Sequence, residues 1–373
     1  MLSPFKQAML FVLGLVTIFV VAIVTALAAI DARHANANVV TKPHRAHHVA
    51  EMGMTRLITP TAKTTTTSDD LQSFANAAPQ NAAELAAGQK PYDAALPPVM
   101  PGPVARVDMS INEQTLEIAP GVRYQTWTFG KTAPGPIIHV RQGQLVSVTM
   151  TNNGMMPHSI DFHAAQVAPN EDFVDIASGK SIHFTFRADA PGAFMYHCGT
   201  VPAMDHMANG MYGAIIVDPR KPLPPADHSY VLVSSEWYLS SDGLSAPAGL
   251  STTKLLDQLP DWVTWNGYAN QYKVHPLAAD PGDTIRFYVI DAGPNLDNDF
   301  HVVGTVLKRA WIDGDVTHEL NGIQTAGVPA GGSGIFDVQI PHPGLYPFVS
   351  HSFAAVGHGE VGLLSIGGVL PKS

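Results

Sequence analysis

An internal repeat constrains the fold of this chain more than any other feature of its sequence. Three short motifs each occur twice and in the same order: Asp-Phe-His at residues 161–163 and 299–301, a Pro-Gly pair before aromatic residues at 190–196 and 342–348, and Gly-x-x-Gly before an apolar run at 210–217 and 359–366. Motifs that recur in one order mark copies of one structural unit. The chain is therefore expected to contain two tandem copies of the same domain.

Both copies are expected to be built from β-strands. Short segments that alternate apolar and polar residues, such as 124–129 and 145–150, are separated by turn signals such as the Pro-Gly pairs. The chain contains 32 Gly and 30 Pro, and no long segment in this region has the 3.6-residue period of a helix. Short strands at regular spacing are typical of β-sandwiches. We therefore predict an all-β fold with one sandwich at residues 97–220 and a second at 221–373.

The N-terminus carries a hydrophobic segment. Residues 8–30 are apolar and uncharged, and this run is long enough to cross a bilayer as a helix. We predict an N-terminal transmembrane anchor at residues 1–30. The alternative is a long signal peptide that is cleaved in the alanine-rich stretch at 35–37. Either one exports the rest of the chain, to the periplasmic face of a bacterial inner membrane or, after cleavage, to the periplasm.

The segment between the anchor and the first sandwich, residues 31–96, is rich in Ala, Thr, Pro, Asn and His and shows no clear periodicity. We expect it to be a flexible linker. The net charge of −10, with only 14% charged residues, argues against binding to nucleic acid, which requires clustered Lys and Arg. The single cysteine, Cys198, excludes an intramolecular disulfide framework.

This cysteine lies in a metal-binding pattern. Cys198 is followed by His206 and Met211, and His158 lies upstream. Two imidazoles, a thiolate and a weak axial thioether form the site that suits electron-transfer copper. A lone cysteine or methionine is more often a buried core residue. The spacing Cys-x7-His-x4-Met with a distant histidine favours the metal site.

The second copy serves as an internal control for this assignment. Alignment of the repeated motifs places a residue that cannot form a blue-copper site opposite each of the four ligands. These residues are Leu296, Ser350, Ala355 and Glu360. The four ligands of the first copy are thus all missing from the second copy, as expected if they bind one ion together.

Three further histidines predict a second metal site. Side chains of adjacent strand residues point to opposite faces, so His197 points away from the site that contains Cys198. His163 lies shortly after His158, and His351 follows the position that aligns with the cysteine. Three imidazoles with one open position are typical of a catalytic metal. For His351 the alternative is an ordinary surface or hydrogen-bonded histidine.

These residues resemble the copper-containing nitrite reductases over roughly residues 97–368. The motifs that carry the resemblance are His-Ser-Ile-Asp-Phe-His at 158–163, Tyr-His-Cys at 196–198, His-x4-Met at 206–211, Asp-Phe-His-Val-Val-Gly at 299–304 and Tyr-Pro-Phe-Val-Ser-His at 346–351. The resemblance implies two tandem cupredoxin-type Greek-key β-sandwiches with one type 1 and one type 2 copper per subunit. It also implies reduction of nitrite to nitric oxide, with the electron passing from the type 1 copper through Cys198 and His197 to the type 2 copper.

The resemblance further implies a homotrimer with the type 2 copper between subunits. His163 and His197 would come from one subunit and His351 from its neighbour. Asp161 and His301 would stand over the open position as catalytic residues, where a carboxylate and a histidine can move protons. The alternatives are a turn residue for Asp161 and a buried, hydrogen-bonded histidine for His301.

Two features depart from the family pattern. Gln324, which precedes Thr325, stands where an acidic residue is expected in a pair that supports the active-site histidine. The N-terminal anchor and linker suggest a membrane-held enzyme. Since the sequence contains no haem motif, its electron donor would be a separate cytochrome c or small cupredoxin.

Two other functions are compatible with parts of the sequence. A two-domain multicopper oxidase needs paired His-x-His motifs, which the sequence lacks, and Gly199 follows Cys198 where that class requires a histidine. A non-enzymatic blue-copper electron carrier leaves the second histidine set and the second sandwich without a role. Copper content separates the three functions, with two ions per chain for the reductase, four for the oxidase and one for the carrier.

Overall fold

The structure is a computed structural model that describes residues 71–371. The anchor predicted at residues 1–30 and most of the predicted linker lie outside this range. Within residues 71–371, no helix has the length and apolar character needed to cross a membrane.

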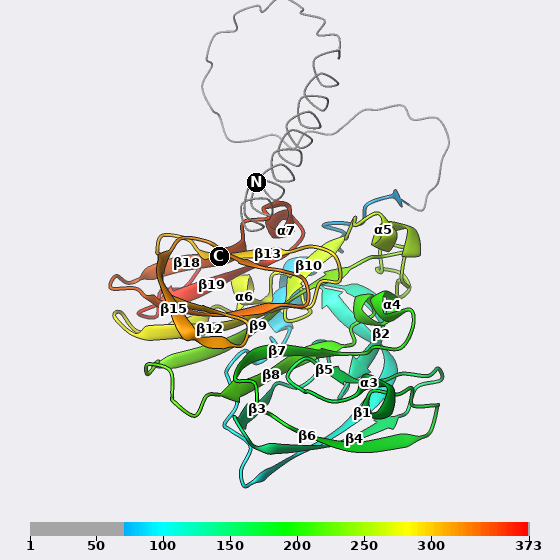
Figure 1. Ribbon diagram of the computed structural model, residues 1–373. Helices are drawn as coiled ribbons and strands as arrows, with labels where there is room; N and C mark the ends of the chain where they lie inside the picture. Colours follow the sequence, from blue (N-terminus) through cyan, green and yellow to red (C-terminus); the bar gives the residue numbers. More distant parts are fainter. Residues whose placement is uncertain (1–70, 372–373) are drawn as a thin grey trace, which may run out of the picture. The chain divides into compact units, whose positions relative to one another are not determined.

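The first sandwich consists of two four-stranded sheets, ordered β2-β1-β4-β6 and β3-β8-β7-β5 (Figure 1). Its strands are β1 (Val104–Ala119), β2 (Val122–Phe129), β3 (Ile138–Arg141), β4 (Leu145–Asn152), β5 (Asp161–Phe162), β6 (Ser181–Arg187), β7 (Gly192–His197) and β8 (Tyr212–Asp218). The predicted alternation is clear in β6, where Phe184 and Phe186 are buried and His183 and Thr185 are exposed. The two phenylalanines pack in the core with Tyr196.

The second sandwich consists of a six-stranded sheet, β10-β9-β12-β17-β14-β15, and a five-stranded sheet, β11-β19-β18-β13-β16. Its strands are β9 (His228–Trp237), β10 (Trp262–Trp265), β11 (Leu277–Ala279), β12 (Thr284–Asp291), β13 (Asn298–Val302), β14 (Leu307–Ile312), β15 (Asp315–Ile323), β16 (Ala326–Val328), β17 (Ser333–Gln339), β18 (Gly344–Ser350) and β19 (Val361–Ile366). The ring of Phe287 lies 5.4 Å from that of Phe300 and 5.8 Å from that of Phe348, between centroids, in the core of this sandwich.

The two sandwiches repeat one strand topology. β1 pairs in parallel with β4, which pairs antiparallel with β6, and β9, β12 and β17 repeat this arrangement. The antiparallel set β5, β7 and β8 recurs as β13, β18 and β19. The two Asp-Phe-His motifs therefore lie on the equivalent strands β5 and β13, and the repeat seen in the sequence is a repeat of topology.

Short helices lie in the connections between strands. They are α2 (Ala82–Gly88), α3 (Pro169–Asp172), α4 (Ala203–Ala208), α5 (Thr252–Leu256), α6 (Gln271–Val274) and α7 (Ala354–Gly357). The one that matters most for the site is α4, because it carries the buried side chain of His206.

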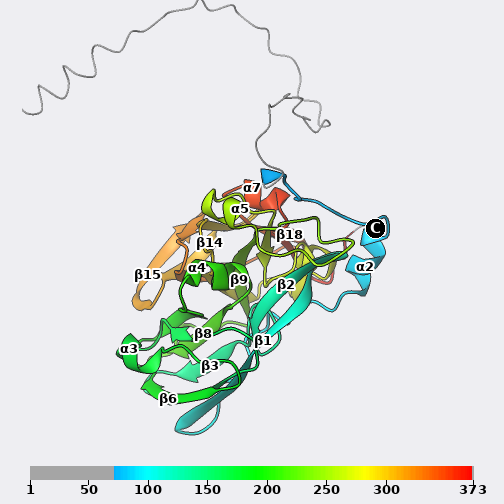
Figure 2. The same cartoon turned by 90° about the vertical axis from the view of Figure 1, so that its right-hand side faces the viewer.

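The β7–β8 hairpin joins the two sandwiches. Its outward residues Met195 and Ile216 pack in one cluster with Val233 of β9 and Trp311 of β14, and both views place β8 beside β9 (Figures 1 and 2). Gly192, at the start of β7, has a φ of +133°, and a Cβ there would lie 2.6 Å from the carbonyl oxygen of Asp313. The backbones approach so closely at this point that only glycine fits.

Residues 71–96 differ from the flexible linker expected for 31–96. Ala94 is only 2% exposed and belongs to the core of the second sandwich. The Phe74 amide donates a 2.6 Å hydrogen bond to Asp261, and the Tyr92 hydroxyl donates one of 2.9 Å to the carbonyl of Gly135. These contacts fix the segment, because each satisfies a buried or half-buried polar group through a distant partner.

Candidate metal centres

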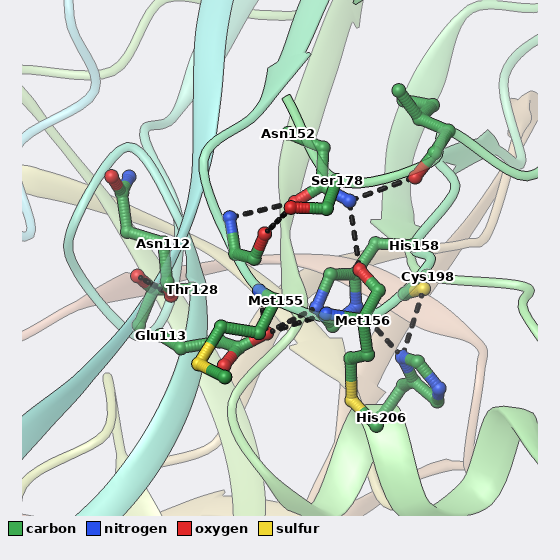
Figure 3. A network of polar contacts seen from close by, with 12 residues as sticks. Asn112, Glu113, Thr128, Asn152, Met155, Met156, His158, Ser178, Cys198 and His206 are labelled. Atoms are coloured by element: carbon green, nitrogen blue, oxygen red, sulfur yellow. Dashed lines mark hydrogen bonds and ion pairs between the residues drawn. The ribbon is translucent and has the colours of Figure 1, made fainter. Parts of the chain in front are cut away.

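A buried cluster of nitrogen and sulfur donors lies inside the first sandwich. His158 Nδ1 is 3.0 Å from His206 Nδ1, and Cys198 Sγ is 3.3 Å from the same nitrogen. The side chains of all three are buried, and their donor atoms lie within 4.8 Å of one another. Figure 3 shows the three side chains turned toward one another. Two imidazoles and a thiol that share one dry point fit copper or zinc rather than a hard cation.

Three segments of the sandwich bring these donors together. His158 precedes β5, Cys198 follows β7 and His206 lies in α4. Two backbone hydrogen bonds close the segment from Cys198 to Met211. The Cys198 amide donates to the Met211 carbonyl at 3.1 Å, and the Met211 amide donates to the His206 carbonyl at 3.2 Å. Met211 is fully buried in the same core cluster as Cys198. The predicted axial residue is therefore held next to the cysteine by backbone bonds.

The surroundings fix the orientation of the donors. The ring of Trp127 lies 5.5 Å from that of His158 and 4.8 Å from that of His206, between centroids. The Ser159 amide donates a 3.3 Å hydrogen bond to Cys198 Sγ. This bond fixes the position of the sulfur, which binds metal as the thiolate.

The electrostatics keep both imidazoles neutral. Burial lowers the pKa of His158, and the Glu113 carboxylate opposes this shift. Burial together with the neighbouring His158 lowers the pKa of His206 to about 4. At neutral pH the lone pairs of both rings are therefore available to a metal ion.

A second cluster lies at the junction of β5 and β7. His163 Nε2 is 3.1 Å from His197 Nε2, and Asp161 Oδ2 is 3.9 Å from the same nitrogen of His197. Asp161 and His197 face each other in the strand register, which fixes their separation. The ligand atoms of all three residues lie within 4.8 Å of one another. His163 is exposed, so this cluster opens to the surface of the chain.

Consecutive residues belong to the two clusters. Cys198 is part of the buried cluster, and His197 is part of the surface cluster. His197 is held in place by a 2.9 Å hydrogen bond from Nδ1 to the carbonyl of Cys198. Because a carbonyl only accepts, this nitrogen carries the ring hydrogen and Nε2 is left with the free lone pair.

The other two histidines predicted at the second site lie together elsewhere. The rings of His301 and His351 are 5.1 Å apart between centroids, and His351 is exposed. His301 Nδ1 lies 2.5 Å from the carbonyl oxygen of Gln324. Among the described residues, His351 does not form a group with His163 and His197 in which all ligand atoms lie within 4.8 Å. Within a single chain, the second set is split into two parts.

Comparisons with known proteins identify the family. Residues 110–222 match the family model described as multicopper oxidase. A copper-containing nitrite reductase of Neisseria meningitidis serogroup A is 36% identical over 271 residues, which cover 70% of this chain and 69% of the relative. The structure of the copper nitrite reductase of Nitrosomonas europaea has a TM-score of 0.67 and 32% identity, covering 71% of this chain and 94% of that one. The chain belongs to the copper-containing nitrite reductases.

This nitrite reductase family member is also similar to a multicopper oxidase of known structure. That protein is 25% identical with a TM-score of 0.63, and the match covers 70% of this chain and 89% of the other. The residues of the site separate the two classes. Gly199 follows Cys198 here, and the sequence contains no His-x-His pair for a three-copper cluster.

In the second sandwich of this nitrite reductase, hydrogen bonds replace the metal donors. Ser350 aligns with the cysteine, and its hydroxyl accepts from the amides of Asp299, at 3.0 Å, and Ser352, at 3.2 Å. Glu360 aligns with the methionine, and its carboxyl accepts from Ser234 and from Asn298 Nδ2. The place that holds the copper donors in the first sandwich is therefore occupied in the second by a hydrogen-bonded polar network.

Sequence reasoning missed the residues that surround the buried cluster. Trp127 packs against both of its histidines, and the Glu113 carboxylate lies 3.5 Å from His158 Nε2. Both residues lie on strands β1 and β2, far from the cluster in the sequence. No local spacing marks them, because only the pairing of the strands brings them to the site.

Proposed function

We propose that this chain reduces nitrite to nitric oxide with copper at both clusters. The observation that carries the proposal is that Cys198 and His197, which are joined by one peptide unit, belong to two different donor clusters. A non-enzymatic electron carrier needs only the first cluster. The second cluster, with its exposed histidine and adjacent carboxylate, supplies a place for a small anion to react.

The donor sets suit two kinds of copper site. His158, Cys198, His206 and Met211 would hold a type 1 copper, because the soft thiolate and thioether stabilise the reduced ion. His163 and His197, together with His351 from a second copy of the chain, would hold a type 2 copper. When bound, copper supplies one-electron redox chemistry at the first site and a Lewis-acidic, reducible centre at the second.

Nitrite reduction to nitric oxide and water consumes one electron and two protons, and we propose that Asp161 of one chain and His301 of a second copy supply the protons. Asp161 Oδ2 stands 3.9 Å from His197 Nε2, at the edge of the surface cluster. His301 bonds through Nδ1 to the Gln324 carbonyl, so that nitrogen carries the hydrogen. Nε2 of His301 is then left with the free lone pair. We assign Asp161 and His301 as the catalytic acid–base pair.

The proposal includes a homotrimer with the type 2 site between chains. It is supported by the separation of His351 from His163 and His197 within one chain and by the exposure of both His163 and His351. A second copy that brings its His351 to the first copy's pair completes three imidazoles. The assembly therefore creates the catalytic site.

The cellular setting is part of the same proposal. Residues 1–30 anchor the chain, and the catalytic part works on the periplasmic side of the membrane. The electron donor is a separate cytochrome c or small cupredoxin. The support for this setting comes from the apolar run at residues 8–30 and from the lack of a haem motif in the sequence.

A nitric oxide electrode tests the function. The full-length, copper-loaded protein in detergent should release nitric oxide from nitrite under anaerobic conditions when a reduced donor is supplied. His351→Ala should abolish this release and keep the blue absorption, whereas His318→Ala, at an exposed histidine outside both clusters, should change neither. A blue parent protein that forms no nitric oxide would favour the electron carrier. Oxygen consumption with four copper ions per chain would favour the oxidase.

Mixing variants tests the shared site. His163→Ala and His351→Ala chains should each be inactive alone, because each lacks one ligand. Chains that are unfolded, mixed and reassembled should regain part of the activity, since some interfaces then combine an intact His163 with an intact His351. Mixed oligomers with no regained activity would contradict a site between chains.

A further inference from the structure

A carboxylate lies next to the buried donor cluster, against the outer nitrogen of His158. Glu113, on β1, projects toward the loop that precedes His158, and its Oε1 accepts hydrogen bonds from the amides of Met155, at 2.6 Å, and Met156, at 3.1 Å. The same oxygen lies 3.5 Å from His158 Nε2. Figure 3 shows Glu113 on the side of His158 that faces away from Cys198.

The outer nitrogen of His158 requires such a partner. Nδ1 faces His206 and Cys198, so a metal bound there leaves the only ring hydrogen on Nε2. His158 is fully buried, and its Nε2 forms no hydrogen bond among the described residues, with Glu113 Oε1 in contact at 3.5 Å. A buried N–H without an acceptor is costly, of the order of 1–3 kcal/mol. The Glu113 carboxylate is the acceptor that the fold offers to it.

The surrounding loop holds the carboxylate in place. A Cβ on Gly154 would lie 2.6 Å from Glu113 Oε1, so the glycine makes room for the carboxylate. Asn152 is buried and donates through Nδ2 to the Met156 carbonyl, at 2.8 Å, while its Oδ1 accepts from the Gly154 amide, at 2.8 Å. Glu113 is therefore locked against the loop, although its side chain is 25% exposed.

We propose that Glu113 is a positioning residue of the type 1 copper site, which orients His158 through its outer nitrogen and sets the reduction potential of the site. A carboxylate that accepts from a metal-bound imidazole fixes the ring and increases its basicity. The more basic ligand stabilises the oxidised, more highly charged copper ion. The negative charge of Glu113 thus lowers the reduction potential. This inference rests on the proposed function, because it requires copper at this cluster.

Two substitutions at Glu113 separate its role toward His158 from a role in only holding the loop at Met155 and Met156. Glu113→Gln keeps an oxygen for the amides of Met155 and Met156 but removes the charge. Glu113→Ala removes both. Asp108→Asn is the matched control, because Asp108 is an exposed acid on the same strand and its change removes the same charge.

Redox titration of the blue absorption band in the copper-loaded, full-length protein tests the inference without a nitrite assay. Loss of an outer partner typically weakens metal binding about 10–100-fold. If Glu113→Gln weakens binding of the oxidised ion tenfold relative to the reduced ion, the potential rises by about 59 mV. The electron paramagnetic resonance spectrum of the site should change with it. Asp108→Asn should match the parent protein in both measurements.

The outcomes distinguish failure of the two proposals. A blue Glu113→Gln protein with the potential and spectrum of the parent would overturn the role of Glu113 and leave nitrite reduction untouched. A parent protein that binds copper without a blue band would overturn the copper assignment itself. Glu113→Ala should raise the potential as Glu113→Gln does, and should also lower the melting temperature because two loop amides lose their acceptor.

Discussion

His197 and Cys198 are consecutive in the chain, yet their side chains belong to separate donor clusters, one at the surface and one in the core. This division follows from their place at the end of β7, where neighbouring side chains alternate between the two faces of a sheet. One peptide unit therefore connects a site that can store an electron with a site that can use it.

Replacing His197 should separate electron storage from catalysis. His197→Ala removes one ligand from the surface cluster but leaves the buried cluster and its backbone bonds unchanged. We expect the blue absorption to remain, the copper content to fall from two ions per chain to one, and nitric oxide formation to drop to background. Elemental analysis and the nitric oxide electrode measure these quantities. Activity that survives the loss of the second copper would contradict the assignment.

Removing the charge of Asp161 should slow proton delivery without removing copper. Asp161→Asn keeps the shape of the side chain, and general acid–base groups typically contribute about 10²–10⁴-fold to a rate. We expect a loss of kcat within this range, with unchanged copper content and blue absorption. Asp299→Asn, at the aligned position of the second copy, is the matched control and should have a much smaller effect. Equal losses in both variants would show that the Asp-Phe-His motif has a structural role.

Much of this arrangement follows from the sequence, because strands alternate and repeated motifs occupy equivalent strands. The grouping of His158, Cys198 and His206, and the separate pairing of His163 with His197, could be predicted from spacing and strand geometry. These residues lie on or beside only a few strands that pair with one another.

Other features could not be predicted, because they depend on contacts between distant segments. Residues 71–96 have a composition typical of a linker, but single side chains such as Ala94 fill gaps in the second sandwich. Glu113 reaches His158 only through the folded sheet. The separation of His351 from His163 within one chain could be expected only from the family resemblance, because strand alternation and spacing do not determine it.

The buried carboxyl of Glu360 should make stability depend on pH. Burial raises its pKa to about 8, with the Glu236 carboxylate adding to the shift and hydrogen bonds from Ser234 and Asn298 opposing it. The ordinary value is 4.5, so folding takes up a proton between these two pH values. Because the folded state binds the proton more tightly, this contribution to stability is present below pH 4.5 and is lost as the pH rises toward about 8.

Thermal unfolding of a Glu360→Gln variant tests the predicted loss of stability with rising pH. Glutamine is neutral at all pH values and keeps an acceptor for Ser234 and Asn298. The parent protein should lose melting temperature between pH 5 and 8, and the variant should lose less over this interval. Glu319→Gln, at an exposed position on β15, should behave like the parent. A variant with the same pH dependence as the parent would assign the effect to other groups.

A buried ion pair should hold the segment at residue 74 to the body of the protein. Lys254 and Asp261 are 2% and 1% exposed and lie 2.8 Å apart, and Asp261 also accepts from the Phe74 amide. Asp261→Asn leaves the lysine buried without its counter-ion, which typically costs about 3–5 kcal/mol. We expect a clear fall in melting temperature and faster proteolysis near Phe74. Asp257→Asn, at an exposed acid close by, should have neither effect, and a parent-like melt for Asp261→Asn would contradict this account.

The most direct test of the central claim is a single turnover of the reduced enzyme. The copper-loaded protein is reduced until the blue band disappears, freed of excess reductant, and mixed anaerobically with isotopically labelled nitrite. The account predicts that the blue colour returns as labelled nitric oxide forms, with one nitric oxide for each electron that the two coppers give up, and that the blue band of His197→Ala does not return with nitric oxide. Return of the blue colour without nitric oxide, or nitric oxide from the His197 variant at the parent rate, would contradict electron transfer through Cys198 and His197 to bound nitrite.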